Sequence, residues 1–588
     1  MREFEVWAPS AAERVELLLG QERVALTRGD GGWWRTDAAA DEGAPYWFSL
    51  DGGDPRPDPR SRRLPEGPHG PSAVFDPTGF AWSDAGWTGV ELSDGVIYEL
   101  HVGTFTAEGT LDAATARLDH LVDLGVTLVE LLPLASFPGV NGWGYDGVAP
   151  WSVHEPYGGP EALQRFVDAC HARGLGVCLD VVYNHLGPDG NYLGEFGPYF
   201  TDRYETPWGW ALNLDGPHSD PVHAYVVDNA LMWLRDFHVD ALRLDAVHEL
   251  YDDRALPVLE DLSTRVDALA AEVGRPLTLI AESDRNDPAT VAPRGPGGAG
   301  GTGLHAQWAD DIHHGLHAAL TGESQGYYAD FATPGALAKV LTTPFFHDGT
   351  WSSFRQRTHG RPVDTAHTPG WRFVASLQTH DQVGNRMTGE RLSHLLPTGV
   401  LACGAALLLT SAYTPMLFMG EEWGASTPWQ YFTDHTDPEL ARAVQEGRKN
   451  EFASHGWDRD DVPDPQAAGT VEHSRLDWSE PAQGTHARLL GWYRSLIALR
   501  HLAPELHDGR LDAVGVEHDL GTGVLVMTRG SYRTVVNLGE QERAVPVSAG
   551  TAAPSVVLAW EPDSTRLADG VLTLPAQSAA VLGPVAGG

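Results

Sequence analysis

Four acidic side chains stand at or just past the ends of four separate apolar runs in this sequence. They are Asp180 in LDVVYNH, Asp245 in LRLDAVH, Glu282 in LIAESD and Asp381 in LQTHDQVGN. A single acid in such a place commonly caps a helix or shapes a loop. Four acids placed alike are better explained by convergence on one pocket, since side chains from neighbouring parallel strands meet at the carboxyl ends of the strands. Two carboxylates in one pocket can cleave a glycosidic bond, one as nucleophile and the other as proton donor.

A basic residue accompanies the second of these acids, because Arg243 stands two residues before Asp245. Side chains alternate along a strand, so this spacing places both on the same side. A guanidinium there would lower the pKa of the Asp245 carboxyl and keep it ionised, as a nucleophile must be. The two residues could equally form a structural ion pair, and the two interpretations are compatible.

From about residue 96 the sequence alternates between short apolar runs and amphipathic stretches. Eight apolar runs read as strands: VIYELHV, TLVELLPL, GVCLDVVYNH, DALRLDAV, LTLIAES, HAQWAD, RFVASLQTHD and PMLFMGEE. The alternation is typical of an α/β protein, and eight is the number of strands in a (β/α)8 barrel, or TIM barrel. We predict a catalytic barrel over residues 91–508, with a small excursion from its third strand at 185–222.

Both ends of the chain are rich in strand-like runs separated by Gly, Asp and Pro. They predict an N-terminal β-sandwich over residues 1–90 and a C-terminal β-sandwich over residues 509–588. Trp33, Trp34 and Trp47 of the N-terminal module could be platforms for sugar rings. Aromatic residues of a small sandwich more often form its core, and that is the interpretation we adopt.

The composition excludes several classes of partner. The chain carries 80 acidic and 40 basic residues, a formal net charge of -40, which repels nucleic acids and anionic membranes. A neutral substrate would be indifferent to this charge. The apolar stretch from Gly399 to Gly420 has the length of a membrane span, but Thr410, Ser411 and Pro415 divide it into a buried helix and a short strand.

The cysteines bear on the cellular compartment. Cys170, Cys178 and Cys403 lie in apolar stretches, which predicts buried free thiols rather than disulfides. Free thiols fit a reducing compartment, and the first residues of the chain show no signal-peptide layout. We therefore expect a cytoplasmic protein.

The four acid-bearing runs together resemble the signature segments of the α-amylase superfamily of glycoside hydrolases. DVVYNH, ALRLDAVH, LIAESD and QTHDQVGN occur in the order that the superfamily shows and span the expected barrel. The resemblance implies that Asp245 is the nucleophile, Glu282 the general acid/base and Asp381 the stabiliser of the transition state. It also implies residues that contact the substrate, for which the candidates are Tyr145, His185, Arg243, His248, His380, Gln382 and Asn385.

Segments that flank the signatures resemble one family of that superfamily, the malto-oligosyltrehalose trehalohydrolases. They include FPGVNGWGYDGV, FTDRYETPWG, QWADDIHHGLHAALTGE and MGEEWGASTPWQYFTDH. Members of this family have an N-terminal β-sandwich, a barrel and a C-terminal β domain. The implied reaction is retaining hydrolysis of the α-1,4 bond beside the terminal trehalose of malto-oligosyl trehalose. It needs no cofactor and proceeds alongside an enzyme that forms this substrate.

Two other functions are compatible with the signatures. One is that of a glycogen-branching enzyme or related glucanotransferase, and the branching enzymes share the N-terminal module and a similar GWGY segment. They differ in whether water or a sugar hydroxyl resolves the glycosyl intermediate. A barrel that has lost catalysis and only binds α-glucan is disfavoured, because such proteins usually lose at least one of the key acids.

The segment QWADDIHH places Trp308, Asp310 and Asp311 just past the sixth expected strand. By the resemblance, these residues are candidates for binding the trehalose end of the substrate. Carboxylates can accept paired hydrogen bonds from sugar hydroxyls, so two aspartates are suited to recognise a disaccharide. Capping of the helix that follows explains the two aspartates equally well.

No metal site is predicted. His313 and His317 stand at i, i+4 on one helix, a spacing that can hold zinc, but no third ligand is evident. Asn184 matches a position that binds structural calcium in many amylases, and calcium is left unassigned. The glycine-rich RGPGGAGGTG, Arg294 to Gly303, lacks the ending of a phosphate-binding loop. We interpret it as a mobile flap beside the substrate groove.

Overall fold

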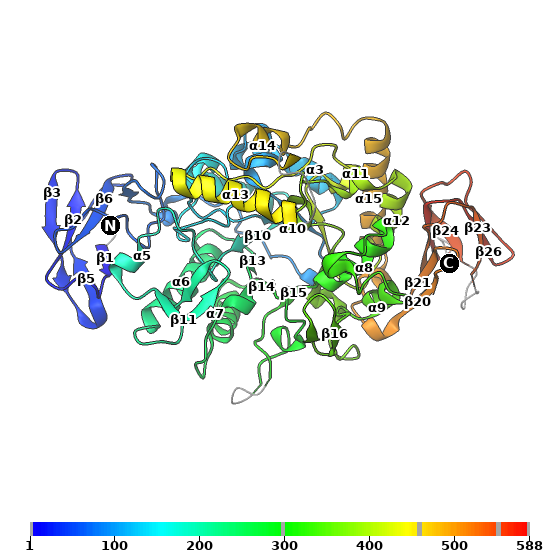
Figure 1. Cartoon of the computed structure of the whole chain (residues 1–588), viewed down its shortest axis with the longest axis horizontal. Helices are drawn as coiled ribbons and strands as arrows, with labels where there is room; N and C mark the ends of the chain where they lie inside the picture. The colour runs from blue at the N-terminus through cyan, green and yellow to red at the C-terminus, as the bar shows by residue number, and fades with distance from the viewer. Residues whose placement is uncertain (1–3, 296–299, 455–460, 548–553, 585–588) are drawn as a thin grey trace.

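Eight parallel strands from the middle of the chain close into a barrel, shown at the centre of the computed structural model (Figure 1). The structure describes residues 4–295, 300–454, 461–547 and 554–584. In barrel order the strands are β8 (Ile97–Leu100), β9 (Leu128–Leu131), β10 (Gly176–Val181), β13 (Ala241–Leu244), β14 (Thr278–Ala281), β15 (Ala306–Trp308), β18 (Phe373–Ser376) and β19 (Thr414–Phe418). Each overlaps one of the eight apolar runs, so the predicted (β/α)8 fold is confirmed.

Helices cover the outside of this barrel. The longer ones are α4 (Gly159–His171), α6 (Asp220–Asp236), α7 (Val258–Val273), α8 (Asp310–Thr321), α12 (Thr398–Leu409), α13 (Pro438–Ser454) and α15 (Gly484–Leu502). Helix α7, in the fourth βα unit, begins directly after Pro257, which is extended and keeps Leu256 before it out of the helix. Between β14 and β15 the described residues contain no α-helix, so this unit departs from the regular repeat.

The inside of the barrel is divided into an apolar floor and a polar layer. Residues from all eight strands form the floor: Ile97, Leu128, Cys178, Ala241, Ile280, Ala306, Trp308, Val374 and Met416. Two residues further along four of the strands, on the same side by alternation, come Glu99, Glu130, Asp180 and Arg243. The register pairs Glu99 with Glu130 and Asp180 with Arg243. The charged layer therefore lies toward the carboxyl ends of the strands, where barrel enzymes carry their active sites.

The N-terminal segment forms two antiparallel sheets, at the left of Figure 1. One contains β1 (Phe4–Trp7), β5 (Trp33–Thr36) and β4 (Thr27–Arg28), and the other contains β3 (Glu22–Ala25), β2 (Val15–Leu19), β6 (Pro45–Leu50) and β7 (Ser72–Ala73). Trp34 is buried in the core, and Trp33 is half-buried against it. The core interpretation is confirmed for Trp34 and fits Trp33, while Trp47 is half-buried.

Between β10 and α6 the chain leaves the barrel, within the stretch expected to form an excursion. This stretch contains α5 (Leu193–Phe196) and the hairpin of β11 (Phe200–Thr206) and β12 (Gly209–Leu212). Trp208 lies in the turn of the hairpin, and its side chain is 51% exposed. The excursion therefore presents an aromatic ring to solvent.

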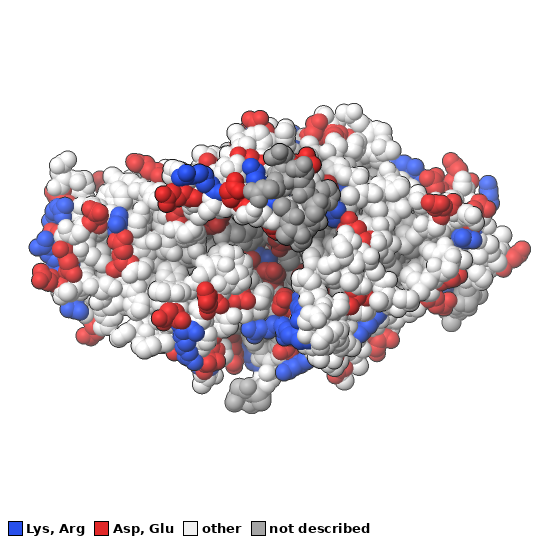
Figure 2. Space-filling view, in the orientation of Figure 1, with Lys and Arg blue, Asp and Glu red and all other residues white. Residues whose placement is uncertain are grey.

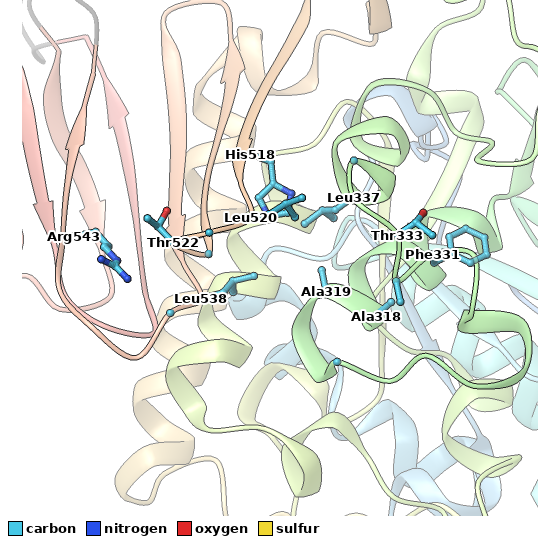
Figure 3. A pocket seen from close by; sticks show the side chains of 16 residues that line it. Ala318, Ala319, Phe331, Thr333, Leu337, His518, Leu520, Thr522, Leu538 and Arg543 are labelled. Atoms are coloured by element: carbon cyan, nitrogen blue, oxygen red, sulfur yellow. The ribbon is translucent and has the colours of Figure 1, made fainter.

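The C-terminal segment forms a five-stranded and a three-stranded sheet, at the right of Figure 1. The larger contains β20 (Val514–Asp519), β21 (Val524–Arg529), β22 (Tyr532–Asn537), β27 (Ser578–Gly583) and β24 (Ser555–Ala559); the smaller contains β23 (Arg543–Pro546), β26 (Val571–Leu574) and β25 (Arg566–Ala568). A pocket of about 490 Å³ lies at the seam between these sheets and the barrel helices α8 and α9 (Ala336–Thr342), lined in part by Leu337, Leu520 and Arg543 (Figure 3). None of the four strand-end acids lines it. The domain limits at residues 90 and 509 remain predictions.

The long apolar stretch folds as α12 followed by β19, as its polar interruptions predict. In the described part of the chain, no helix is long and apolar enough to cross a membrane. Cys170, Cys178 and Cys403 are buried free thiols, which confirms the expectation from their apolar surroundings.

Glu421, directly after β19, is a buried acid whose Oε2 has no hydrogen-bond partner among the described residues. Burial raises the pKa of this carboxyl to about 8. The unfolded chain releases the proton at the ordinary carboxyl pKa, whereas the folded chain retains it until about pH 8. The folded state binds more protons between these two values, so stability is lost as the pH rises through that window.

We expect Glu421→Gln to weaken this pH dependence, because an amide cannot ionise. Its melting temperature should fall less than that of the wild type between about pH 5.5 and about pH 7.5. Thermal unfolding followed by circular dichroism at the two pH values measures the difference. Replacement of the exposed Glu439 by Gln is the control and should leave the wild-type slope unchanged. An unchanged slope in Glu421→Gln would contradict a protonated carboxyl at this position.

Candidate active site

The guanidinium of Arg243 joins three of the four strand-end acids. Arg243 lies on β13 and its side chain is fully buried. Its Nη1 donates to Asp180 Oδ2 at 2.7 Å and to Asp245 Oδ1 at 2.8 Å. Its Nη2 donates to Glu282 Oε2 at 2.8 Å. The surface is hollowed over the barrel strands in the space-filling view, and acidic side chains are visible inside the hollow (Figure 2).

The pKa of Asp245 differs from the value expected beside an arginine. Burial raises this pKa well above its usual range, and Arg243 only partly offsets the effect of burial. Three neighbouring carboxylates, at Glu282, Asp180 and Asp381, raise it further. The expected net lowering is therefore wrong, because one guanidinium does not compensate for the loss of water and for three other acids.

Glu282 behaves differently although it contacts the same guanidinium. Burial raises the pKa of Glu282, but the charge of Arg243 and a hydrogen bond from the Ala246 N–H outweigh burial and bring the pKa below its usual value. That N–H donates to Glu282 Oε2 at 2.8 Å, from a residue in the left-handed region with φ 37°. The two carboxyls titrate as one coupled pair, in which burial favours the protonated form of Asp245 and the contacts of Glu282 favour its ionised form.

Asp381 lies in the first turn of the short helix α10 (His380–Gly384), beyond the end of β18. The helix begins with a capping box, in which the Thr379 hydroxyl accepts from the Asp381 N–H and Gln382 Oε1 accepts from the Thr379 N–H. Asn385 Nδ2 donates to Asp381 Oδ1 at 3.1 Å. Gln382 and Asn385, both expected to contact substrate, are thus engaged in fixing the helix and its acid.

His380 is the second buried cation of the site. Its Nδ1 lies 2.5 Å from Glu99 Oε1, and its backbone N–H donates to Glu99 Oε2 at 3.0 Å. Its Nε2 lies 3.6 Å from Asp381 Oδ2. Burial lowers the pKa of His380, but the charges of Asp381 and Glu99 outweigh burial and raise the pKa to about 9. The ring is therefore an imidazolium at neutral pH.

Tyr145 and His185 line the same site on the side of the excursion. Tyr145 stacks on His380 with ring centroids 5.1 Å apart and donates its hydroxyl to Asp180 Oδ2 at 2.6 Å. His185 Nε2 contacts the carbonyl oxygen of Tyr145 at 2.9 Å. Trp208 stacks on His185 with centroids 4.2 Å apart. The exposed indole thereby extends the aromatic wall of the site toward solvent.

Two of the residues expected at the trehalose end have their side chains engaged within the protein. Trp308 is buried, and its ring lies 4.4 Å from the Arg243 guanidinium, so it supports that group from below. Asp311 accepts the backbone N–H groups of Phe346 and His347 at 2.7 and 3.0 Å. Asp311 therefore holds the loop that follows α9 against the first turn of α8.

Asp310 and His248 face the catalytic pair. Burial, together with the charges of Glu282 and Asp381, raises the pKa of Asp310 to about 6. None of the described residues hydrogen-bonds to the Asp310 carboxylate. His248 lowers the pKa of Glu282 by its charge, and its Nδ1 has no partner in the described part of the chain. These two side chains are available to a ligand in a way that Asp311 is not.

Two buried acids of the site were not expected from the sequence. Glu99 and Glu130 lie on β8 and β9, the first two barrel strands, in the same polar layer as Asp180 and Arg243. The signal that could have found them is a single acid inside an otherwise apolar run, as in VIYELHV and TLVELLPL. Such an acid in a barrel strand has to face the polar interior, since the outer face packs on helices.

The histidines at zinc spacing are engaged with protein groups. His313 Nε2 contacts the Tyr328 hydroxyl, and His317 Nε2 contacts Glu323. Across the described ranges, no group of three or more potential ligands is placed to hold a metal ion. Part of the glycine-rich segment, residues 296–299, lies outside the described residues, and its interpretation as a flap stays a prediction.

Comparison with known proteins places this geometry in a family. The alpha-amylase catalytic-domain model matches residues 75–208. The chain is 56% identical to the malto-oligosyltrehalose trehalohydrolase of Arthrobacter ramosus, across 93% of this chain and 95% of that protein. It is 52% identical to the protein of the same name from Rhizobium sp. (strain M-11), across 98% and 97% of the two chains. The chain belongs to the malto-oligosyltrehalose trehalohydrolase family.

This trehalohydrolase-family member is thus a glycoside hydrolase of the α-amylase type, as its signature segments predict. A solved Salmonella typhimurium protein, described provisionally as an alpha amylase, superposes with a TM-score of 0.90 and 36% identity, covering 99% of this chain and 97% of that one. A branching enzyme of Xanthomonas oryzae pv. oryzae is 27% identical over 73% of this chain and 61% of its own. The higher identity to the trehalohydrolases, over nearly the whole length, favours hydrolysis over branching.

We expect the trehalohydrolase-family chain to lose turnover when either of its paired carboxyls is replaced. Asp245→Asn and Glu282→Gln should each reduce kcat/KM on an α-glucan substrate by at least about 10³-fold, because each removes a group that changes protonation or bonding during the reaction. Steady-state assays measure the loss, and circular dichroism checks the fold. Replacement of Glu249, which contacts Tyr251 instead, by Gln is the control and should retain most of the activity. Near-normal turnover in either catalytic variant would refute the assignment.

Proposed function

We propose that this protein hydrolyses the α-1,4 bond beside the terminal trehalose unit of malto-oligosyl trehalose, releasing trehalose and a shortened maltooligosaccharide. The observation that carries the proposal is the pair of Asp245 and Glu282 on one buried guanidinium, in a chain of the trehalohydrolase family. The family membership supports the choice of substrate, and the paired carboxyls support the chemistry.

The proposed reaction is a double displacement. Asp245 attacks the anomeric carbon of the glucose residue next to trehalose, while Glu282 donates its proton to the oxygen that leaves with trehalose. A glycosyl ester forms on Asp245. Glu282 then takes a proton from water, which displaces the carboxylate and restores the α configuration. Asp381, fixed by Asn385, supplies negative charge beside the oxocarbenium-like transition state.

The catalytic pair has to exchange a proton before the bond is cut. In the free site, burial favours the protonated form of Asp245, and the guanidinium favours the ionised form of Glu282. Catalysis needs the reverse arrangement. Both carboxyls hydrogen-bond to Arg243, so moving one proton between them leaves the total charge of the cluster unchanged. Positive charge that develops at the anomeric carbon favours ionised Asp245, so the substrate itself drives the exchange.

Exposed aromatic rings near the acids are suited to bind the sugars on either side of the cleaved bond. Trp208 lies on the excursion, and Tyr327 and Phe354 are 40% and 56% exposed with their centroids 5.9 Å apart. The charges of Asp381 and Asp310 act on the Tyr327 hydroxyl, which indicates that this ring borders the site. Apolar faces of glucose pack on such rings, and the Asp310 carboxylate can accept hydrogen bonds from trehalose hydroxyls.

A second part of the proposal concerns the setting of the reaction. The terminal trehalose unit of the substrate has to be made from an ordinary maltooligosaccharide by rearrangement of its reducing end. We therefore propose that the protein works alongside an enzyme that forms malto-oligosyl trehalose. The buried free cysteines support a reducing, cytoplasmic location.

The experiment that tests the function compares malto-oligosyl trehalose with a plain maltooligosaccharide of equal length. We expect faster cleavage of the first, with free trehalose as a product, because its end fills a site that a linear glucan does not. Chromatography follows the products, and proton NMR follows the new reducing end, which should appear first as the α anomer. Branched product without trehalose would favour the branching alternative, and equal rates on both substrates would contradict the specificity for trehalose.

A further inference from the structure

A buried acid on the first barrel strand binds His380, a cation of the site that the reaction scheme does not use. Glu99 is 1% exposed, and both of its carboxylate oxygens contact His380, one at the ring Nδ1 and one at the backbone N–H. Glu99 thereby fixes the imidazole and the start of α10 together. We propose that Glu99 is a positioning residue that keeps His380 as an imidazolium oriented toward Asp381. The inference rests on the roles proposed above for Asp381 and the catalytic pair.

The contacts of His380 fit a ring that carries protons on both nitrogens. Nδ1 has to be a donor, because Glu99 Oε1 at 2.5 Å offers a lone pair. In a neutral ring, Nε2 would then be an acceptor that faces Asp381 Oδ2 at 3.6 Å, another acceptor. The doubly protonated ring donates to Glu99 and turns a charged N–H toward Asp381 Oδ2, which at 3.6 Å lies beyond hydrogen-bond distance. The pKa of about 9 has the same origin, since burial lowers it and the two carboxylates raise it.

Charged and titratable groups face His380 from every element around it. They are Glu99 and His101 at the end of β8, Glu130 on β9, Asp180 on β10, Arg243 on β13, Glu282 after β14, Tyr145, and Asp381 on α10 itself. Burial lowers the pKa of His101 to about 3, so this neighbour is uncharged. Burial raises the pKa of Glu130 well above its usual range, and neither of its oxygens has a partner within the described residues. Glu99 is thus the charged group that hydrogen-bonds to the ring.

The charge on His380 bears directly on Asp381. Burial raises the pKa of Asp381, and His380 opposes that effect. If His380 lost its proton, Asp381 would face a neutral acceptor, and its carboxylate would be both less stable and less well oriented. Removing the charge of Glu99 therefore affects the reaction indirectly, because it changes the protonation state of His380.

The pH dependence of kcat/KM tests this inference, because it reports groups of the free enzyme. In the wild type, we expect kcat/KM to fall on the alkaline side of the profile, the alkaline limb, near pH 9, where His380 loses its proton. In Glu99→Gln, the amide oxygen can still accept from the ring but carries no charge. The limb should move to lower pH by at least about one unit, and kcat should change more than KM. Glu99→Asp holds the charge further from the ring and should give a limb between these two.

Glu130→Gln is the matched control. It replaces a neighbouring buried acid, one strand away, that makes no hydrogen bond to the ring, so the alkaline limb should move less than in Glu99→Gln. The inference is overturned if Glu99→Gln lowers activity without moving the limb, or if Glu130→Gln moves it equally. Should Glu99→Gln fail to fold, Glu99→Asp decides, and a limb identical to that of the wild type would overturn the inference.

This test is separable from the proposed function. The wild-type products on malto-oligosyl trehalose report the function, whereas the limb is compared between variants on whichever α-glucan the wild type cleaves. If the wild type released no trehalose, the proposed function would fail, but the role of Glu99 could still be tested by the same pH profiles.

Discussion

The catalytic site depends on one buried guanidinium. Arg243 donates to carboxylates from three neighbouring strands, at Asp180, Asp245 and Glu282. Each of these acids is largely shielded from solvent. Carboxylates this close together would repel one another without a shared counter-charge. Closure of the barrel brings the three strands side by side. Because Arg243 donates to both Asp245 and Glu282, the two carboxyls belong to one hydrogen-bonded cluster in which their pKa values shift in opposite directions.

Charge balance explains how these acids divide their tasks. The polar layer contains more acids than bases, and burial raises the pKa of Glu130 and of Asp245 well above the usual range. Glu282 contacts the buried guanidinium of Arg243, and Glu99 contacts the buried ring of His380. The surplus of acid suits a reaction whose transition state resembles an oxocarbenium ion. A single proton moving within the cluster can then switch the pair from its resting to its reactive form.

Features that depend on residues close together in the sequence could be predicted, and features that depend on residues from other strands could not. The eight strands and the shared face of Arg243 and Asp245 depend on local periodicity, and they were identified correctly. The net pKa of Asp245 depends on acids from other strands, so reasoning from its nearest arginine gave the wrong direction. Glu99 and Glu130 were missed because apolar neighbours dominate the pattern of their strands. The contact that Asp311 makes within the protein was missed for the same reason, because its partner is the backbone of a loop distant in the sequence.

The most direct measurement of the central claim, that Asp245 bonds covalently to the sugar, is mass spectrometry of Glu282→Gln treated with an α-maltosyl fluoride. Fluoride leaves without a proton donor, so formation of the glycosyl enzyme does not require Glu282, whereas its hydrolysis does. We predict a maltosyl adduct that accumulates on the peptide containing Asp245. An adduct on another carboxylate, or consumption of the fluoride by a protein that is never modified, would contradict this mechanism.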